Sequence, residues 1–446
     1  MPRSKFTIPS PLSIALILFG FVFSMAVVFF KPEDVTWLDH LAASAKNSYN
    51  GMWGVGGLAF LVQMSLMLVL GHILALAKPI QGLITKLLNL AQNQQQAVLI
   101  TASTTMLAGF INWGFGLIIG AILAKSFADH LVKLGKTVNK PLLAAVGYTG
   151  MMVWHGGISG SSLIKIAEPG HLNSLAPTLY NSEDLVDIST TVFGAFNLVT
   201  FGLAFMAIIG LALYLSKKFP GKLSSEEKTL SLEKEDGTVL DPGLDNKAWF
   251  AWIVGISLGA VALVMSLDAN GLSFINPNFI NCSLLALAFI CHGNVNKFSA
   301  ALDIAISGTS GILIQFPIYF AIMGIMSGSG MILSIADFFV SISTETSLPI
   351  YTFLSAGLIN LFVPSGGGQW MIQGPIILES CNNLGIPVQK GILALAYGDQ
   401  ITNMLQPFWA LPLLAITKVK AGEMLPYTFK FFLVGLFVYG LCLFFY

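Results

Sequence analysis

The chain has 446 residues, of which 55% are apolar and 10% are charged, and its formal net charge is zero. Soluble globular domains are about 45–50% apolar and about 25% charged. This composition therefore excludes an ordinary soluble enzyme and indicates an all-α polytopic membrane protein embedded in a lipid bilayer. The balanced charge, without a long basic run, also gives no footprint for nucleic acid. The scattered cysteines, which we interpret as small apolar side chains, are Cys282, Cys291, Cys381 and Cys442.

The first apolar run follows Arg3 and Lys5 and extends from residue 11 to 30. It is longer than the apolar region of a signal peptide, so we expect a retained span with the N-terminus in the cytoplasm. A helix needs about 20 apolar residues to cross the hydrocarbon layer. About nine transmembrane helices are predicted, at 11–30, 51–77, 141–163, 189–214, 248–266, 279–293, 299–333, 391–416 and 426–446.

Two further apolar segments, 98–124 and 350–378, are less regular. Lysines flank the first segment on both sides, and positively charged loops stay in the cytoplasm. A hairpin that enters and leaves on the cytoplasmic side satisfies this rule, whereas a simple crossing does not. The flanks of 350–378 hold Asp337, Glu345 and Glu379 with a single lysine, Lys390. That segment therefore predicts a second re-entrant hairpin, opening to the outside.

A polar stretch from residue 216 to 247 is the one clear linker and has too few apolar residues to fold alone. It is expected in the cytoplasm, between a first half at 1–215 and a second half at 248–446. The sequence "AGFIN", ending at Asn112, recurs as "AGLIN", ending at Asn360, and each copy lies in one of the irregular segments. The pattern predicts an inverted repeat, which is the architecture of many secondary transporters.

Irregular backbone at membrane depth survives only where it is buried in protein or lines a water-filled cavity. Glycine-rich tips let peptide N–H groups approach a ligand, and helix N-termini add partial positive charge. Both features suit an anion such as a carboxylate. The alternative is that the glycines allow close helix packing and the amides cap helix ends. Four segments fit this description: 108–116, 147–162, 364–369 and 397–407.

These segments supply the candidate site residues. An acid within a span is costly and by default functional, so Asp399, with Thr402 and Asn403, is expected to couple transport to an ion or a proton. A capping role for Asp399, and a neutral structural role for His155, remain alternatives. The candidate substrate-binding residues are Asn112, Trp113, His155, Asn360, Ser365, Gly366, Gly367, Gly368, Gln369, Trp370 and Gln373.

Motifs of soluble enzymes are not convincing in this chain. Ser162 to Lys165 matches SxxK, a short pattern expected by chance, and its companion motifs are absent. No nucleotide-binding loop follows the P-loop pattern. We therefore expect neither an enzyme nor an organic cofactor.

The sequence "VPSGGGQWMIQGPI" at 363–376, with "WHGGISGSS" at 154–162 and "GDQITNMLQPFW" at 398–409, closely resembles the bacterial short-chain fatty acid transporter family. The resemblance covers nearly the whole chain. It implies membership of the ion-transporter superfamily, with two opposed hairpins, two unwound helices and an elevator-type movement. Those relatives bind substrate, and often sodium, at the hairpin tips. The tips here lack the Ser-Asn-Thr signature of the sodium-dicarboxylate branch, so the coupling ion stays open.

The expected function is secondary active transport of small monocarboxylates, such as butyrate or acetoacetate, across the inner membrane, coupled to a sodium or proton gradient. A coupling Na⁺ is expected near Asn112, Asn360 and Asp399. The alternatives are a transporter of another carboxylate or of an amino-acid-like solute, and a membrane-embedded enzyme or receptor. A homodimer is expected by analogy with elevator proteins, which need a fixed scaffold.

Overall fold

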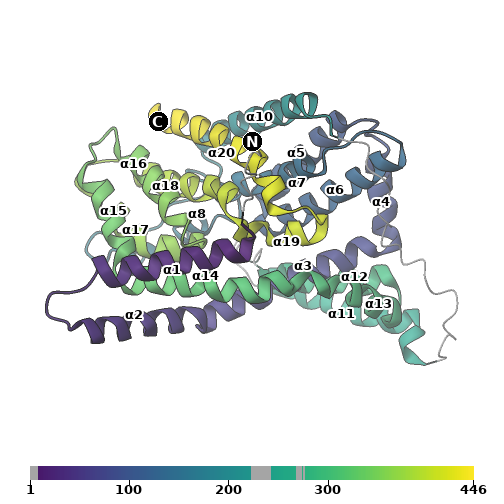
Figure 1. Ribbon diagram of the computed structural model, residues 1–446, viewed down its shortest axis with the longest axis horizontal. Coiled ribbons are helices and arrows are strands. Elements are labelled where there is room, and N and C mark those ends of the chain that lie inside the picture. Colours follow the sequence, from purple (N-terminus) through teal and green to yellow (C-terminus); the bar gives the residue numbers. More distant parts are fainter. Residues whose placement is uncertain (1–8, 222–242, 268–273, 275–276) are drawn as a thin grey trace, which may run out of the picture.

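The computed structural model describes residues 9–221, 243–267, 274 and 277–446, and within these ranges the secondary structure is helical. The helices form two layers, seen one above the other in Figure 1. The lower layer contains α1 (Pro11–Phe29), α2 (Trp37–Met52), α3 (Val55–Leu76), α11 (Ala248–Leu267), α12 (Pro277–His292), α13 (Val295–Ile306) and α14 (Ser310–Gly328). The upper layer contains α5 (Gln94–Ile111), α6 (Trp113–Lys133), α7 (Lys140–Gly147), α10 (Ala195–Lys218), α16 (Leu348–Asn360), α18 (Val388–Thr402) and α20 (Ala421–Phe444).

Shorter elements join the two layers. Along the chain, α4 (Lys78–Leu88) leads from α3 into α5, and α15 (Met331–Ser341) leads from α14 into α16. Three more helices lie where the layers meet, and they carry the segments that sequence analysis singled out: α8 (Ser161–Lys165), α17 (Gly366–Asn383) and α19 (Pro407–Thr417).

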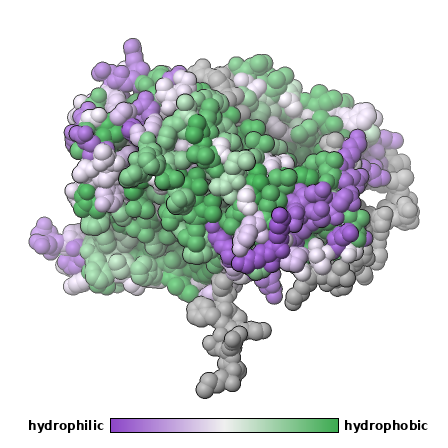
Figure 2. Space-filling view, turned by 90° about the horizontal axis from the view of Figure 1, so that it is seen from above, coloured by the Kyte–Doolittle hydropathy of each residue, from purple (hydrophilic) through white to green (hydrophobic). Residues whose placement is uncertain are grey.

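Seven helices among the described residues are long and apolar enough to cross a membrane, and shorter apolar helices accompany them. The surface agrees with this, because apolar side chains cover the middle of the face in Figure 2 and hydrophilic ones gather toward its two ends. The protein is therefore a helical, multi-pass membrane protein. The central part of the expected linker, residues 222–242, lies outside the described residues.

Three segments predicted as single spans are interrupted. The segment 299–333 is divided at Ser307–Thr309, where the short turn η3 separates α13 from α14. The segment 141–163 ends as a helix at Gly147 and continues as the turn η1 (Thr149–Met152) and a glycine-rich loop. The segment 391–416 is divided by the turn η4 (Asn403–Leu405). Proline at 407 disfavours helical backbone in the residue before it, and Gln406 is extended, with φ −97° and ψ 126°.

α2 was not predicted, because its sequence is rich in polar residues. It packs against α14 through glycines: a Cβ placed on Gly51 would lie 2.3 Å from the carbonyl oxygen of Phe320 and 2.8 Å from the Cα of Gly324. Small residues at a helix crossing let two backbones approach closely. A polar helix is accommodated here because its small side chains face α14.

The segment predicted as the first hairpin is a pair of helices, α5 and α6, joined at Asn112. This residue is extended, with φ −153° and ψ 127°, and its side-chain oxygen accepts hydrogen bonds from the N–H groups of Gly114 and Phe115. The two helices pack closely, since Thr105 Oγ1 donates to the carbonyl of Gly116 at 2.9 Å. The extended backbone of Asn112 therefore separates α5 from α6, and its side chain caps the start of α6.

The segment predicted as the second hairpin is also a helix, a break and a helix. α16 ends at Asn360, and α17 starts after Ser365, whose hydroxyl caps it by accepting from the N–H of Gly368 at 3.2 Å. Gln369 on α17 donates to the carbonyl of Ala356 on α16 at 2.9 Å. The breaks lie where they were predicted. The membrane orientation of the two pairs, and the inverted repeat that they would form, remain predictions.

The two broken helices meet at their interruptions. The hydroxyl of Tyr148, which precedes η1, donates to the carbonyl oxygen of Asn403 at 3.1 Å. The side-chain N–H of Asn403, the first residue of η4, donates to the carbonyl of Met151 at 3.3 Å. Each break thus supplies partners for peptide groups of the other.

We predict that Gly120→Ala destabilises the fold. A Cβ at Gly120 would lie 1.9 Å from the carbonyl oxygen of Gly147, and overpacking of a core costs about 1–3 kcal/mol. The matched control is Gly210→Ala on α10, where nothing lies within 4 Å; we expect no loss, because alanine favours the helix. Thermal unfolding of the purified variants in detergent measures both effects. A wild-type melting temperature for Gly120→Ala would contradict the close contact between α6 and α7.

Candidate functional site

A cavity of about 270 Å³ lies between the two layers. Its walls come from α3 and α14 of the lower layer, from the tip of the α16–α17 pair, from the loop before α8, and from the starts of α6 and α19. Six aromatic side chains form much of its lining: Phe60, Trp113, Trp154, Tyr319, Phe320 and Trp409. Every interrupted element of the upper layer therefore contributes to one partly closed cavity.

The tryptophans pack edge to face. The ring centroids of Trp113 and Trp409 are 5.1 Å apart with the planes at 69°, and those of Phe60 and Trp409 are 5.9 Å apart at 86°. Edge-to-face pairs are a favoured arrangement of aromatic rings. The result is a rigid apolar wall suited to a short hydrocarbon group.

Two members of this aromatic lining also carry neutral polar groups. Tyr319 and Trp154 line the cavity, and neither the phenol oxygen of Tyr319 nor the indole N–H of Trp154 has a hydrogen-bond partner in the described part of the chain. Gly366 and Gly367 also line it, at the first turn of α17, where N–H groups have no intrahelical acceptor. The first turn of a helix attracts anions. Among the described residues, none that lines the cavity is charged, so an anion would be held there by neutral groups.

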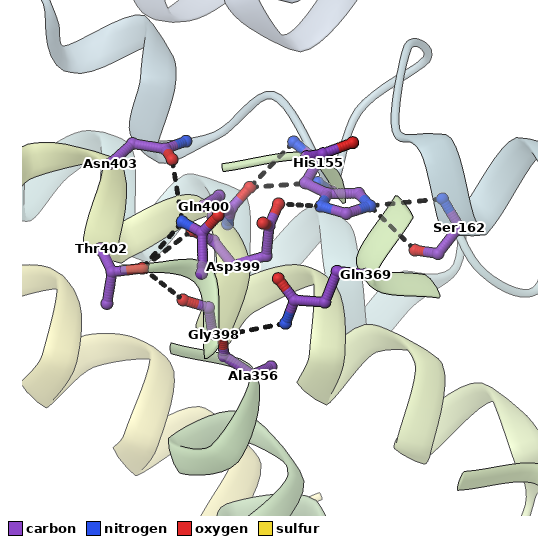
Figure 3. A network of polar contacts seen from close by, with 12 residues as sticks. His155, Ser162, Ala356, Gln369, Gly398, Asp399, Gln400, Thr402 and Asn403 are labelled. Atoms are coloured by element: carbon purple, nitrogen blue, oxygen red, sulfur yellow. Dashed lines mark hydrogen bonds and ion pairs between the residues drawn. The ribbon is translucent and has the colours of Figure 1, made fainter. Parts of the chain in front are cut away.

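The buried side chains of Asp399, His155 and Ser162 are connected by polar contacts (Figure 3). The ring of His155 stacks on Trp154, with centroids 4.5 Å apart. Its Nδ1 forms a short contact with the Oδ2 of Asp399. Its Nε2 lies 3.0 Å from the hydroxyl of Ser162 and 3.3 Å from the Ser162 backbone nitrogen. His155 and Ser162 are 0% exposed and Asp399 is 1% exposed.

The loop that carries His155 is held by carboxamides. The side-chain oxygen of Gln400 accepts from the N–H groups of His155 and Gly156, at 3.0 and 3.1 Å. Asn197 on α10 donates to the carbonyl of Gly156 at 2.7 Å. These bonds replace the helical partners that the loop lacks, so His155 is fixed although its backbone is irregular.

The hairpin tip lies directly against His155. A Cβ added to Gly366 would lie 2.7 Å from the Cε1 of His155 and 2.9 Å from the Cη2 of Trp154. Only glycine fits at this position without a shift of one of the rings. At Gly367 the nearest atom would be the Cβ of Ser161, 3.7 Å away, so a side chain at 367 would enter the cavity instead.

The predicted substrate-binding residues fall into two groups. Four of them line the cavity: Trp113, Ser365, Gly366 and Gly367. His155 stacks on Trp154 of that lining, and the N–H of Gly368 donates to the capping hydroxyl of Ser365. The structure therefore brings together the hairpin tip and the loop after η1, which the sequence analysis treated as separate segments.

The second group makes other contacts. The amide nitrogen of Gln369 donates to Gln373 at 2.7 Å as well as to Ala356. The indole N–H of Trp370 donates to Nε2 of His171 at 2.9 Å, outside the cavity. Burial, together with the charge of Lys165, lowers the pKa of His171, which favours the neutral ring that this bond requires.

Two of the oxygens near which a sodium ion is expected have other partners in this structure. The side-chain oxygen of Asn112 accepts from the N–H groups of α6, and Oδ2 of Asp399 faces His155. Asn360 turns its nitrogen, not its oxygen, toward the carbonyl of Asp399, at 2.7 Å.

Asn360 instead ties the second break together. Its amide nitrogen also contacts Thr402 Oγ1 and Asn403 Oδ1, at 2.9 and 3.0 Å, and its carbonyl accepts from Gln406. The side-chain oxygens of Asn360 and Gln369 are buried and have no partner in the described part of the chain. A cation in this region could be coordinated by these two oxygens.

Some cavity residues could not be found from sequence. Tyr319, Phe320 and Phe60 lie on uninterrupted apolar stretches of α14 and α3, which carry no local signal. Trp154 and Trp409 lie in segments that the sequence analysis quoted, but they were not chosen. Ser162 was noted only as part of an SxxK match, and its contact with His155 depends on the fold.

These features define a helical, multi-pass membrane protein with a small, partly closed cavity. The chain belongs to the short-chain fatty acid transporter family, whose model, described as "Short chain fatty acid transporter", matches residues 3–446. A protein of Escherichia coli K12 that carries a provisional name as a short-chain fatty acid transporter is 32% identical over 446 residues, covering 98% of this chain and 96% of that protein. The protein is therefore a transporter rather than an enzyme.

A Haemophilus influenzae protein with the same provisional name is 32% identical over 402 residues, covering 88% of each chain. Two solved structures are similar over most of the chain. The YdaH transporter of Alcanivorax borkumensis has a TM-score of 0.47 and 14% identity over 98% of each chain. MtrF of Neisseria gonorrhoeae has a TM-score of 0.43 and 16% identity, covering 97% of this chain and 95% of that one. Both scores lie below 0.5, so neither likeness decides the fold or the function.

We predict that Gly367→Val prevents a small carboxylate probe, butyrate, from binding in the cavity without unfolding the protein, because the added methyl groups enter the cavity. Gly367→Ala is the matched control and should bind nearly as well as the wild type, since its Cβ would make only an ordinary contact of 3.7 Å. Quenching of tryptophan fluorescence reports binding, because three tryptophans line the cavity. Wild-type affinity in Gly367→Val would show that butyrate binds elsewhere.

Proposed function

We propose that the protein is a secondary active transporter of short-chain fatty acids, small monocarboxylates such as butyrate or acetoacetate, across the inner membrane, coupled to a sodium or proton gradient. The observation that carries the proposal is the cavity, whose aromatic lining includes two buried donors without a partner in the described part of the chain. The family to which the chain belongs supports the same substrate class.

The size and polarity of the cavity suit a small anion with a short tail. Pockets for drug-sized ligands measure roughly 300–1,000 Å³, and this cavity, at about 270 Å³, is smaller. Each buried CH₂ contributes about 0.8 kcal/mol, so the aromatic wall alone discriminates weakly between chain lengths and the size of the cavity must set the upper limit. An amino-acid-like solute would bring an ammonium group, and no acidic side chain lines the cavity to bind it.

The proposed mechanism is an elevator-type movement of the upper layer past the lower layer. The cavity lies at their boundary, with Phe60 and Tyr319 on one side and the hairpin tip on the other. Movement along this boundary would carry a bound anion with the tip and leave the lower layer as a scaffold. By analogy with elevator proteins, that scaffold would form a homodimer.

The first prediction from this proposal concerns Tyr319→Phe, which removes a donor and keeps the ring. A hydrogen bond to a charged group contributes about 1.5–3 kcal/mol, so we expect butyrate to bind about tenfold more weakly, or worse. Tyr214→Phe is the control, because Tyr214 is 55% exposed on α10. Equal affinities in Tyr319→Phe and the wild type would remove the phenol from the site.

Transport itself is tested by exchange in reconstituted vesicles. Vesicles loaded with unlabelled butyrate should take up radiolabelled butyrate faster with the wild-type protein than with Gly367→Val. That variant corrects for acid that crosses the bilayer unaided. Equal rates for the two proteins, with exchange of another solute by the wild type alone, would reject the substrate class.

The opposed hairpins make a topological prediction. We expect single cysteines at Gln92 and Thr137, in a chain whose native cysteines are replaced, to react with an impermeant thiol reagent only from the cytoplasm. Cysteines at Thr346 and Asn383 should react only from outside. All four positions are exposed. Reaction at Gln92 and Thr137 from opposite sides would show that α5 and α6 together cross the membrane.

A further inference from the structure

We propose that the coupling ion is a proton, that the buried pair of His155 and Asp399 carries it, and that Ser162 positions the ring nitrogen that receives it. This inference rests on the proposed transport function and names its coupling ion. It starts from the chain of contacts in Figure 3, in which Asp399 and Ser162 approach opposite nitrogens of the His155 ring.

The contacts define where the ring carries its proton in this conformation. The backbone N–H of Ser162 points to Nε2 at 3.3 Å, and a peptide nitrogen can only donate. Nε2 is therefore without a proton, and the ring's one proton is on Nδ1, facing the carboxylate of Asp399. With a neutral ring beside a carboxylate, the pair has a net charge of minus one.

A further proton, taken from water, would bind at Nε2. The new N–H would then face the N–H of Ser162, so that contact must break. The hydroxyl of Ser162, 3.0 Å from Nε2, can turn from donor to acceptor and keep its bond. Uptake of a proton therefore changes the contacts at the start of α8, where the neighbouring Ser161 lines the cavity.

Around the pair of His155 and Asp399, the described part of the chain holds no other buried acid, lysine or arginine. Among the buried residues that the structure describes, Asp399 is the only acid, and none is a lysine or an arginine. The other titratable side chains near this loop are the phenols of Tyr148, Tyr319 and Tyr397, which ionise only near pH 10 in water. The nearest lysine along the chain, Lys165, is half exposed and paired with Glu168.

This arrangement makes the anion and the proton bind together. A carboxylate in the cavity lies next to Trp154, and His155 stacks on the other side of that ring. Without the extra proton the anion is placed near a net negative pair, which repels it. With the proton the pair is neutral overall and its imidazolium attracts the anion. By linkage, each ligand then raises the affinity of the other by the same factor.

The hairpin tip can control access to this pair. Gly366 lies against both Trp154 and His155, at distances that leave no room for a side chain. When the tip is seated, as in this structure, the His155 ring is fully buried. Displacement of the tip would uncover the cavity and the ring at the same time, so anion and proton would enter from the same side.

Two other readings of the same residues are weaker. The order Asp399, His155, Ser162 is that of a serine hydrolase triad, but the Ser162 side chain is fully buried and does not line the cavity, so no substrate carbonyl reaches it. A sodium ion would need oxygens that face one another. Asp399 Oδ2 is instead directed at His155, and the side-chain oxygens of Asn360 and Gln369, which have no partner in the described part of the chain, are neutral.

The test is calorimetry of butyrate binding to the purified protein in detergent, in two buffers with different heats of ionisation. We expect the wild type to take up about one proton per butyrate, and its affinity to rise up to about tenfold per unit decrease in pH within the titration range. Sodium should leave the affinity unchanged. His155→Gln should bind butyrate without proton uptake. Asp399→Asn should also lose the uptake, which decides the question if the first variant does not fold.

The serines separate a positioning role from a binding role. Ser162→Ala should keep the proton uptake and shift the pH profile of butyrate affinity toward acid, because the charged ring loses its acceptor. Ser161→Ala should weaken binding by the same factor at every pH. A Ser162→Ala profile that is lowered uniformly and not shifted would reject the positioning role.

The outcomes distinguish the two proposals. If the wild type does not bind butyrate at all, the proposed function fails and this inference fails with it. If butyrate binds without proton uptake and sodium tightens it, the proton is wrong while the transport function stands. Undiminished proton uptake in both His155→Gln and Asp399→Asn would place the proton on another group.

Discussion

The whole structure depends on how it satisfies peptide groups at breaks in its helices. Lipid offers no hydrogen bonds, so an interrupted helix at membrane depth must find partners inside the protein. Here the two broken helices supply them to each other, through Tyr148 and Asn403, and carboxamides such as Gln400 bind the remaining N–H groups. The two interrupted helices satisfy their peptide groups because the interruptions lie next to each other. The cavity lies where the interrupted elements come together.

The choice of carboxamides has an electrostatic consequence. Asparagine and glutamine satisfy the breaks without adding charge, since each offers both a donor and an acceptor. Among the described residues, the interior therefore keeps a single acidic side chain, Asp399, whose short contact is with His155. A buried charge with one partner is sensitive to any new charge nearby, and a carboxylate in the cavity would be such a charge. Because the side chains that bind the backbone at the breaks are neutral, the charge of a bound ligand would act mainly on the pair of His155 and Asp399.

The sequence predicted the places where helix-breaking residues interrupt an apolar stretch. It did not predict which residues of the regular apolar helices line the cavity. Glycines, prolines and amides within apolar stretches predicted irregular backbone at 108–116, 147–162, 364–369 and 397–407, and a helix ends or begins within each of these segments. Tyr319 and Phe60 lie on regular apolar helices and look like any lipid-facing residue in the sequence, so their place in the cavity depends on tertiary packing. The helix α2 was missed because its sequence is rich in polar residues and because α14, the helix that it packs against, is distant in the chain.

The glycines at the hairpin tip show why a local pattern has more than one cause. All three open α17, yet each has a different neighbour: Gly366 meets His155 and Trp154, Gly367 faces the cavity, and Gly368 donates to the capping hydroxyl of Ser365. A run of glycines in the sequence suggested one property, close approach of backbone to ligand. The structure divides that property into contact with the ring that carries the proposed proton, space for the proposed substrate and a start for the helix. Because the three functions lie on consecutive residues, a movement of the tip would change all of them together.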